Sequence, residues 1–235
     1  MKQISVKCFD GTTVIYPKEL NDMLFHVTLA KNLSSIVATR QLESASRLVQ
    51  RVGASKALLR CVRDTSSEVA PGITLNDQRP MRGWKKDGLA EYLEYLNQHV
   101  YFWQWSPLES YSGNQQRRNP SIRHAAMYGG RYFSPTAPSW DRVLLRFGQK
   151  ELEAMNISKG PSFSICNSGA PDHNSDLLDL RTRVFSGTRS TGVEIVFRDI
   201  VLLPESAEIW NRQTALWIRL VRVDSVEHFT TVNRG

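Results

Sequence analysis

Two polar residues that could bind a ligand stand in an apolar segment near the start of the chain. In LFHVTLAKNLSSI, residues 24–36, His26 and Thr28 alternate with apolar residues just before a pattern that predicts a helix. An imidazole and a hydroxyl can both hydrogen-bond to the hydroxyls of a sugar. We weigh two interpretations of this segment: an ordinary strand-to-helix junction with a satisfied core histidine, and a histidine that faces a pocket.

A glutamate stands out in the same way near the other end of the chain. In STGVEIVFRDIVLLP, residues 190–204, Glu194 lies among apolar and β-branched residues that predict a buried strand. A carboxylate loses its hydration in such a place and is rarely found there. Glu194 therefore either occupies the wet face of an edge strand or lies at the floor of a cleft, where it could stabilise a cationic transition state.

Other common catalytic and metal-binding patterns are absent from the sequence. It contains no Walker loop, GxGxxG, GxSxG, HExxH or CxxC motif. Its five histidines are scattered, so we expect no metal site. The three cysteines are widely spaced, which predicts neither a disulfide framework nor a zinc site and suits a reducing cytoplasm.

The composition is that of a globular protein with a basic surface. Apolar residues make up 41% of the 235 residues and charged residues 23%, with a net charge of +7. Nine of the 30 basic residues are lysines, which leaves 21 arginines. Arginine binds phosphate in a bidentate manner and stacks on flat rings, so this balance favours nucleic acids or phosphorylated ligands. No apolar run is long enough to span a membrane, and the first residues do not resemble a signal peptide.

The elements that must position His26 and Glu194 are short. Strands and helices alternate without a regular βαβ rhythm, which favours an α+β fold in a single domain over residues 1–235. We expect a hairpin in 1–18 and strands at 24–28, 99–105, 141–147, 161–169 and 192–203. We expect helices, one or two in 32–50, and others at 54–63, 89–96 and 150–156. Residues 106–139 predict a long loop or a mobile insertion around a helix near 120–128, and residues 215–223 a last strand or helix.

Three segments in this order resemble the DarT-like ADP-ribosyltransferase family. LFHVTLAKNLSSI is similar to its opening strand and helix, with His26, Thr28 and Asn32 at the matching positions. HVYFWQWSP, residues 99–107, looks like its aromatic strand, and GVEIVFRDIVLLPESAEI, residues 192–209, like its catalytic-glutamate strand. The chain also resembles a related bacterial family of unknown function, including its NDQRPM and NSGA segments.

The resemblance implies a split two-sheet core with NAD, the co-substrate, bound between the sheets. It assigns Glu194 to the ribose from which nicotinamide departs, much as a carboxylate serves in glycoside hydrolysis. It implies that His26, supported by Thr28 and Asn32, holds the ribose on the adenosine side. Tyr101 or Phe102 would stack on the nicotinamide. Arg79 and Arg60 are both candidates for the arginine that neutralises the pyrophosphate.

The sequence departs from the family at two places. The family has a glycine-leucine pair after the first helix, where this chain has Arg40-Gln41 before Leu42. Arginine-modifying relatives carry a second carboxylate two residues before the catalytic glutamate, where this chain has Gly192. That difference and the positive charge favour a nucleic-acid acceptor over a protein.

The leading hypothesis is therefore an NAD-dependent mono-ADP-ribosyltransferase that modifies a base of DNA or RNA. The resemblance further implies a cytoplasmic bacterial toxin held in check by an antitoxin, or a toxin of anti-phage defence. Two alternatives remain open. One is a protein-directed ADP-ribosyltransferase, and the other is a non-catalytic nucleic-acid-binding module with the same fold.

Overall fold

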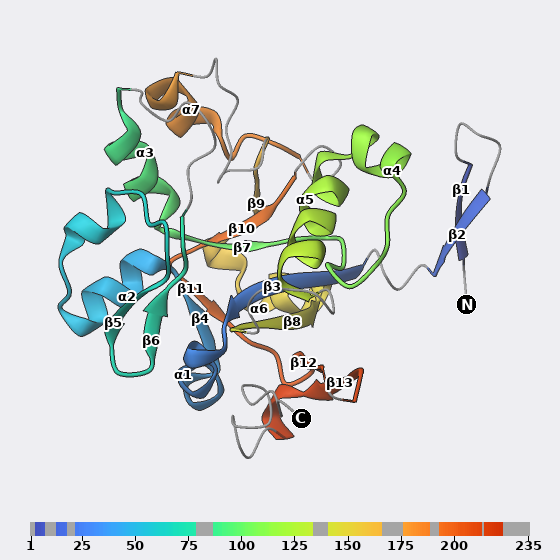
Figure 1. The fold of residues 1–235 in the computed structure, drawn as a ribbon, viewed down its shortest axis with the longest axis horizontal. Helices are drawn as coiled ribbons and strands as arrows, with labels where there is room; N and C mark the ends of the chain where they lie inside the picture. Colours follow the sequence, from blue (N-terminus) through green and yellow to red (C-terminus); the bar gives the residue numbers. More distant parts are fainter. Residues whose placement is uncertain are drawn as a thin grey trace.

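The chain folds into several small sheets connected by short helices, so the predicted α+β class is confirmed (Figure 1). The structure is a computed structural model. It describes residues 3–7, 13–17, 22–78, 87–133, 141–165, 176–188, 193–212 and 214–222.

A four-stranded antiparallel sheet carries His26. Its strands follow the order β13 (Leu216–Arg219), β12 (Glu208–Asn211), β8 (Arg142–Gly148) and β3 (Met23–Leu29). The longest pairing joins β3 and β8 over seven residues, with His26 opposite Leu145. Because β3 has a neighbour within the sheet on one side only, its other side can meet a second sheet.

A three-stranded sheet meets β3 at that free side. It consists of β7 (His99–Phe102), β10 (Ile195–Arg198) and β9 (Ser162–Phe163), with β10 in the centre. Phe25 and Trp103 join the two sheets through reciprocal backbone hydrogen bonds of 2.8 and 2.9 Å. The expected two-sheet core is thus present, and its junction lies beside His26.

The described residues also form three two-stranded sheets. The predicted N-terminal hairpin is confirmed as β1 (Gln3–Lys7) and β2 (Thr13–Pro17). Strand β4 (Gln41–Glu43) pairs with β11 (Ile200–Leu202), and β5 (Ser67–Ala70) pairs with β6 (Ile73–Leu75).

The helices lie around the central sheets, whereas the β1–β2 hairpin is drawn apart from them (Figure 1). Helix α3 coincides with the expected element at 89–96, and the helix expected near 120–128 is α5. The α-helices are α1 (Leu33–Thr39), α2 (Ala45–Val52), α3 (Leu89–Leu96), α4 (Gly113–Arg118), α5 (Pro120–Tyr128), α6 (Gln149–Met155) and α7 (Leu177–Arg183). Shorter helical turns are η2 (Ala30–Asn32), η3 (Lys56–Leu59), η4 (Gly129–Phe133), η5 (Ile157–Lys159) and η6 (Leu220–Arg222). Within these described ranges, no helix is both long and apolar enough to cross a membrane.

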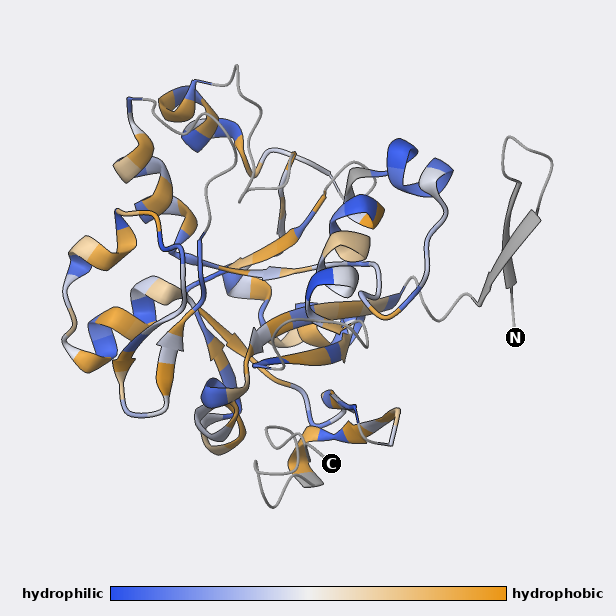
Figure 2. Ribbon diagram, viewed as in Figure 1, coloured by the Kyte–Doolittle hydropathy of each residue, from blue (hydrophilic) through white to orange (hydrophobic). Residues whose placement is uncertain are grey.

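The main core lies against one face of the three-stranded sheet. Side chains alternate along a strand, so Val100 and Phe102 of β7 face the same way as Ile195 and Phe197 of β10. All four are at most 3% exposed and belong to one apolar cluster. Figure 2 shows the central strand β10 mainly in orange, as apolar residues. The opposite face of this sheet is left for other residues.

At two positions the secondary structure differs from the prediction because a residue adopts the left-handed backbone conformation. Arg40 ends α1 in the left-handed conformation, at φ 55°, where glycine is usual. Its guanidinium donates to Pro204 O at 2.6 Å, which holds the turn and lets β4 follow. Asp199 is also left-handed, at φ 61°, and divides the expected strand 192–203 into β10 and β11.

Candidate functional site

A cavity of about 500 Å³ lies where the two sheets meet. A volume of this size is typical of small-molecule sites. Its wall includes residues of β3, β6, β7 and α5, the beginning of β8, and the residue that precedes β10. The polar and aromatic members of the wall include His26, Thr28, Asn32, Tyr101, His124 and Glu194.

His26 is held in one protonation state and one tautomer. Burial lowers its pKa to about 4, so the ring is neutral at neutral pH. Its Nδ1 lies 2.8 Å from Tyr101 O. A carbonyl oxygen can only accept, so Nδ1 carries the proton and Nε2 is an acceptor. The Phe25–Trp103 bridge thus places the neutral His26 ring next to Tyr101 O. Its Nε2 remains a hydrogen-bond acceptor for a ligand hydroxyl.

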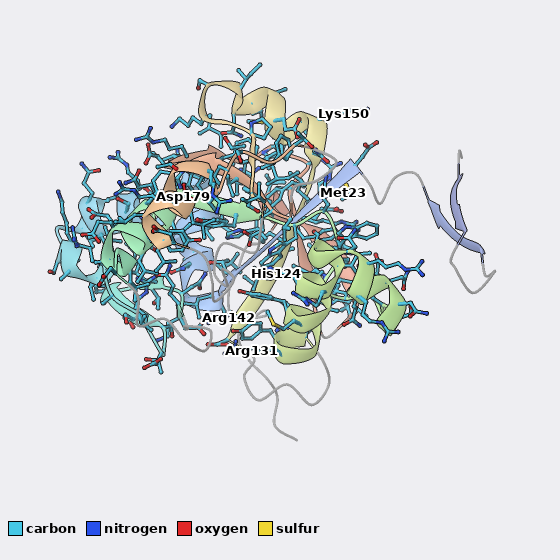
Figure 3. The ribbon with its side chains drawn as sticks, turned by 90° about the horizontal axis from the view of Figure 1, so that it is seen from above. Met23, His124, Arg131, Arg142, Lys150 and Asp179 are labelled. Carbon is cyan, nitrogen blue, oxygen red and sulfur yellow. The ribbon has the colours of Figure 1, made fainter. Side chains whose placement is uncertain are left out.

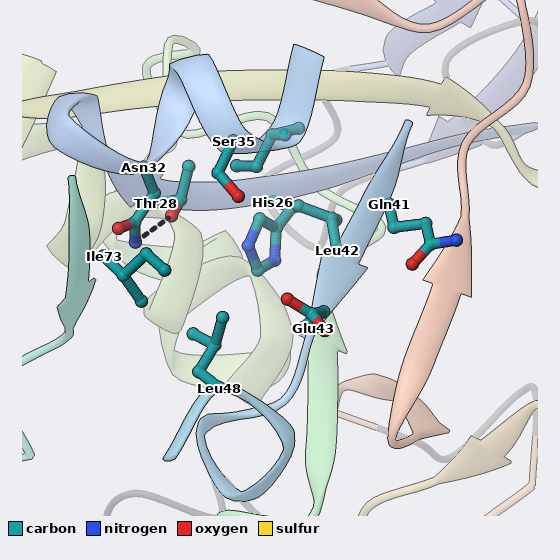
Figure 4. Close-up of a pocket in the computed structure, with 10 residues that line it drawn as sticks. His26, Thr28, Asn32, Ser35, Gln41, Leu42, Glu43, Leu48 and Ile73 are labelled. Carbon is teal, nitrogen blue, oxygen red and sulfur yellow. Dashed lines mark hydrogen bonds between the residues drawn. The ribbon is translucent and has the colours of Figure 1, made fainter. Parts of the chain in front are cut away.

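Asn32 joins the start of α1 to β6. Its Nδ2 donates to Thr74 O at 2.8 Å, and its Oδ1 accepts from Thr74 N at 2.8 Å. Nδ2 also lies 3.4 Å from Thr28 Oγ1, the contact dashed in Figure 4. Thr28 and Asn32 line the cavity next to His26, but the Asn32 amide is used mainly to hold the cavity wall together.

A small recess of about 40 Å³ lies beside His26 and shares His26, Thr28 and Asn32 with the cavity wall. Figure 4 shows the residues that line it. Ser35 and Gln41 add polar atoms to its wall, and Glu43 lies at its lower edge. The Glu43 carboxylate is paired with Arg51 at 2.7 Å. The recess therefore extends the polar surface next to His26 without adding an unbalanced charge from Glu43.

Glu194 places a buried carboxylate in the same cavity. The residue is 4% exposed and directly precedes β10. Its backbone is fixed by Ser164, whose amide donates to Glu194 O at 3.0 Å and whose Oγ accepts from Glu194 N at 2.9 Å. The edge-strand interpretation of Glu194 is therefore wrong, because the side chain is shielded from solvent and lines a cavity shared with His26.

His124 is a cavity residue that sequence reasoning missed. It lies on α5, is 5% exposed, and places Nδ1 3.9 Å from Glu194 Oε1. Neither ring nitrogen has a hydrogen-bond partner, and the ring stacks on Tyr128 at 4.8 Å. Burial and the charge of Arg123 lower its pKa to about 4, so it is neutral at neutral pH. Its position in the polar segment 106–139 gave no signal that separates it from the other histidines.

Aromatic rings form one side of the cavity. Tyr101 lines it, as does Trp103, whose Nε1 is buried without a partner. Burial, together with Tyr132 and Glu194, raises the pKa of Tyr128, so its hydroxyl keeps its proton. Phe102 is a wrong prediction. It is 0% exposed and packs edge-on against Phe147 and Phe197 in the core, because alternation along β7 turns it away from Tyr101.

The arginines of the cavity are not the predicted ones. Arg60 does not line it and instead pairs with Glu91 and Glu94 on the surface, at 2.6 and 2.9 Å. Arg79 lies outside the described residues, as do residues 189–192 before Glu194. The cavity is lined instead by Arg63, Arg131 and Arg142. Their sequence context, with many other arginines nearby, gave no signal that separates them from the rest.

These three arginines differ in how firmly they are held. Arg63 donates to Asn76 O, Leu58 O and Asn97 Oδ1. Arg142 is 6% exposed and pairs with Asp77 at 2.5 Å. Arg131 is 36% exposed and lies 3.5 Å from Asp77, at the side of α5 shown in Figure 3. Arg131 is therefore the arginine of this group that can most readily turn toward a ligand phosphate.

Comparison with known proteins identifies similarities at two levels. Residues 22–127 match a family described as a family of unknown function (DUF7002). No curated protein matches the chain. Among solved structures, the chain is similar to Thermus sp. 2.9 DarT in complex with NAD+, with 12% identity and a TM-score of 0.36 over 84% of this chain and 85% of that chain. A likeness of this degree carries no argument about activity, so we base the proposed function on the cavity.

Proposed function

We propose that the protein is an NAD-dependent mono-ADP-ribosyltransferase that modifies a base of single-stranded DNA or RNA. The observation that carries the proposal is the position of Glu194. Its buried carboxylate lines one cavity with His26, although 168 positions separate the two residues in the sequence. Two polar residues on apolar segments are more simply explained by one shared ligand than by two separate accidents of packing.

The cavity wall suits NAD in its polar and aromatic groups. Both nitrogens of His124 and Nε1 of Trp103 are buried without partners, and such atoms cost free energy unless a ligand or water meets them. NAD carries hydroxyl, amide and phosphate groups that can meet donors and acceptors of this kind. Arg131 is the candidate for the pyrophosphate, since arginine binds phosphate oxygens in a bidentate manner. Tyr101 and Trp103 offer flat surfaces to the nicotinamide.

The reaction transfers ADP-ribose. When bound, NAD supplies a ribose carbon from which nicotinamide leaves with the electron pair of the broken bond. A nitrogen of the acceptor base bonds to that carbon and releases its proton to solvent. Positive charge grows on the ribose as the bond breaks, and a carboxylate in a cavity of low polarity stabilises it strongly. We assign this role to Glu194.

Two neutral histidines support the carboxylate. A protonated His124 only 3.9 Å from Glu194 would neutralise the charge that the ribose needs, whereas its lowered pKa keeps it uncharged. An uncharged His124 can also accept a hydrogen bond from the acceptor base. His26 Nε2 can accept a hydrogen bond from a ribose hydroxyl, because Nδ1 is bound to Tyr101 O.

The acceptor follows from the charge of the chain and the residues around Glu194. The net charge is +7 and most of the basic residues are arginines, which favours a nucleic acid over a protein as the acceptor. Gly192 stands where a second carboxylate would be needed for arginine modification. Such an activity would make the protein toxic to its own cell. We therefore extend the proposal to a bacterial toxin, of a toxin–antitoxin or anti-phage system, restrained by an antitoxin.

The test compares wild type with Glu194→Gln, which keeps the side-chain shape and removes the charge. We expect nicotinamide release to fall by at least about a hundredfold. Glu205→Gln, at an exposed glutamate, serves as the matched control and should release nicotinamide like wild type. Equal release by Glu194→Gln and wild type would overturn the role of Glu194.

Labelled NAD identifies the acceptor. Wild type is incubated with labelled NAD and, separately, single-stranded DNA, RNA or cell protein. We expect label on a nucleic acid. Label on protein alone would favour the protein-directed transferase, and no nicotinamide release with any acceptor would favour the non-catalytic binding module.

A further inference from the structure

A second cavity, about 420 Å³ in volume, lies over the face of the three-stranded sheet that is turned away from the core. Its wall comes from the C-terminal ends of α3 and α7, from η5 and from the strands β7, β9 and β10. His99 belongs to the walls of both cavities, so the second cavity adjoins the first.

The register of the strands explains the polar character of this face. His99 is paired directly with Arg198, and Val196 with both Tyr101 and Ser162. Paired residues point to the same face of a sheet, so these five side chains share one face. That face is opposite to the one formed by Val100, Phe102, Ile195 and Phe197 in the core. It therefore continues from Tyr101 in the first cavity to Arg198 in the second.

A cluster of aromatic rings stands on this face. Phe185, which follows α7, lies 4.4 Å from the His99 ring and 5.5 Å from the Tyr95 ring, measured between centroids. Tyr95 and His99 are 5.1 Å apart. All three rings line the second cavity and are only partly buried. The apolar core cluster of α3 and α7 lies behind Tyr95 and Phe185, so that these rings keep one side for a ligand.

Two cations flank the rings. Lys159, at the end of η5, is exposed and lines the cavity. Arg198 is 67% exposed, and its Nε lies 3.7 Å from Asp199 Oδ2, a surface contact of little energy. The hydroxyl-bearing residues Ser162, Thr182 and Ser186 complete the polar part of the wall. The cavity thus combines flat rings with positive charge and hydrogen-bonding groups.

We propose that the second cavity binds a nucleotide of the single-stranded acceptor, with its base on the Tyr95–His99–Phe185 rings and its phosphates on Lys159 and Arg198. Stacking platforms beside cationic grooves are how proteins bind single strands. This inference rests on the proposed function, because it makes the second cavity the place where the strand is held while a neighbouring base enters the first cavity. The shared residue His99 places the two cavities next to each other, as neighbouring nucleotides of one strand require.

Binding of single-stranded oligonucleotides tests the inference. The full chain carrying Glu194→Gln is titrated with fluorescent DNA and RNA oligonucleotides of the same sequence, and anisotropy is measured at several salt concentrations. Three further changes are compared in this background: Lys159→Ala with Arg198→Ala, Phe185→Leu, and the control Lys56→Ala with Lys150→Ala. The control removes two exposed lysines outside both cavities, so the change in net charge is the same.

The expected results differ among the variants. The Lys159/Arg198 pair should lower affinity at least tenfold and reduce the slope of log affinity against log salt by about 1.4, since each phosphate contact to a single strand contributes about 0.7. Phe185→Leu should lower affinity about tenfold through lost stacking, with the salt slope unchanged. Affinity for NAD, measured by calorimetry, reports whether the first cavity of each variant is intact.

Two results would overturn the inference. One is a loss of oligonucleotide affinity in the Lys56/Lys150 control equal to that in the Lys159/Arg198 variant. The other is an oligonucleotide affinity of the Lys159/Arg198 and Phe185 variants equal to that of their Glu194→Gln parent. If nicotinamide release still depends on Glu194 in that case, the proposed function stands and the second site falls. If the variants lose oligonucleotide affinity while wild type releases no nicotinamide, the second site stands as a nucleic-acid site and the transferase proposal falls.

Discussion

Glu194 Oε1 lies 3.9 Å from His124 Nδ1 in the wall of the larger cavity, and each of the two side chains is 4% exposed. The distance is too long for a hydrogen bond, and both nitrogens of His124 lack a partner. An arrangement of this kind costs folding free energy. Such costs are typical of functional sites, where a ligand later meets the unsatisfied groups.

His124→Phe should therefore make the protein more stable and less active. Phenylalanine keeps a ring that can stack on Tyr128 and Trp103, and it removes two unsatisfied nitrogens, each of which costs about 1 kcal/mol or more when buried. We expect a higher midpoint of thermal unfolding together with slower nicotinamide release.

His99→Phe is the matched control for that change. The Nδ1 of His99 is bonded to Tyr95 O at 3.0 Å, so its loss removes one hydrogen bond from that carbonyl, which keeps the bond from Gln98 N. We expect this variant to be less stable than wild type. A loss of stability in His124→Phe as large as in His99→Phe would show that the His124 nitrogens are satisfied.

The sequence identifies only some of the cavity residues. Glu194 and His26 could be found because each breaks an apolar strand pattern. His124 and Arg131 could not, because they lie in the polar segment 106–139, whose helices α4 and α5 have no long apolar stripe. Their place in the wall depends on how α5 packs over the sheet junction, which is a tertiary contact without a local signal.

Strand periodicity also separates Tyr101 from Phe102, the two residues predicted to stack on the nicotinamide. The alternation in HVYF puts Val100 in the core. The same alternation puts Phe102 on the core side with Val100, and Tyr101 on the cavity side with His99. Choosing between Tyr101 and Phe102 required the register of β7 with β10, which depends on pairing between segments almost a hundred residues apart.

Folding stability should fall as the pH is lowered from about 6.5 towards 4. In the folded chain the pKa values of His26 and His124 are both lowered to about 4, against 6.5 for an unperturbed histidine. The unfolded chain therefore takes up protons in this range that the folded chain does not, which favours unfolding. A tenfold change in a proton-binding constant corresponds to about 1.4 kcal/mol, so the two histidines together contribute several kcal/mol.

Urea unfolding between pH 7.5 and 4.5 measures this dependence. His124→Phe should show a visibly shallower fall in the free energy of unfolding than wild type, because one of the two titrating groups is gone. An identical slope in the two proteins would contradict a lowered pKa for His124.

Asn32→Ala should cost about 2 kcal/mol of stability. The change removes two hydrogen bonds of 2.8 Å to the backbone of Thr74. The amide and the carbonyl of Thr74 then lose their Asn32 partner. We also expect weaker NAD binding, because β6 and the segment after it form part of the cavity wall.

Thermal unfolding and calorimetric titration with NAD check this change. Ser34→Ala, two residues along at an exposed position of α1, is the control and should behave like wild type in both measurements. Wild-type stability with lost NAD binding in Asn32→Ala would instead mean that the Asn32 amide contacts NAD directly.

Removal of the charge should affect mainly stability at Arg142 and mainly NAD binding at Arg131. Arg142→Ala takes the closest cation away from the buried carboxylate of Asp77, so we expect a loss of about 3–5 kcal/mol in stability.

Arg131→Ala breaks a looser, more exposed pair at 3.5 Å, which is worth about 1 kcal/mol or less. If Arg131 binds the pyrophosphate, its removal should raise the KM for NAD about tenfold. Arg131→Lys should recover only part of that loss, because lysine lacks the two-pronged geometry. Arg117→Ala, at an exposed position of α4, controls for net charge. An unchanged KM in Arg131→Ala would exclude this arginine from the pyrophosphate site.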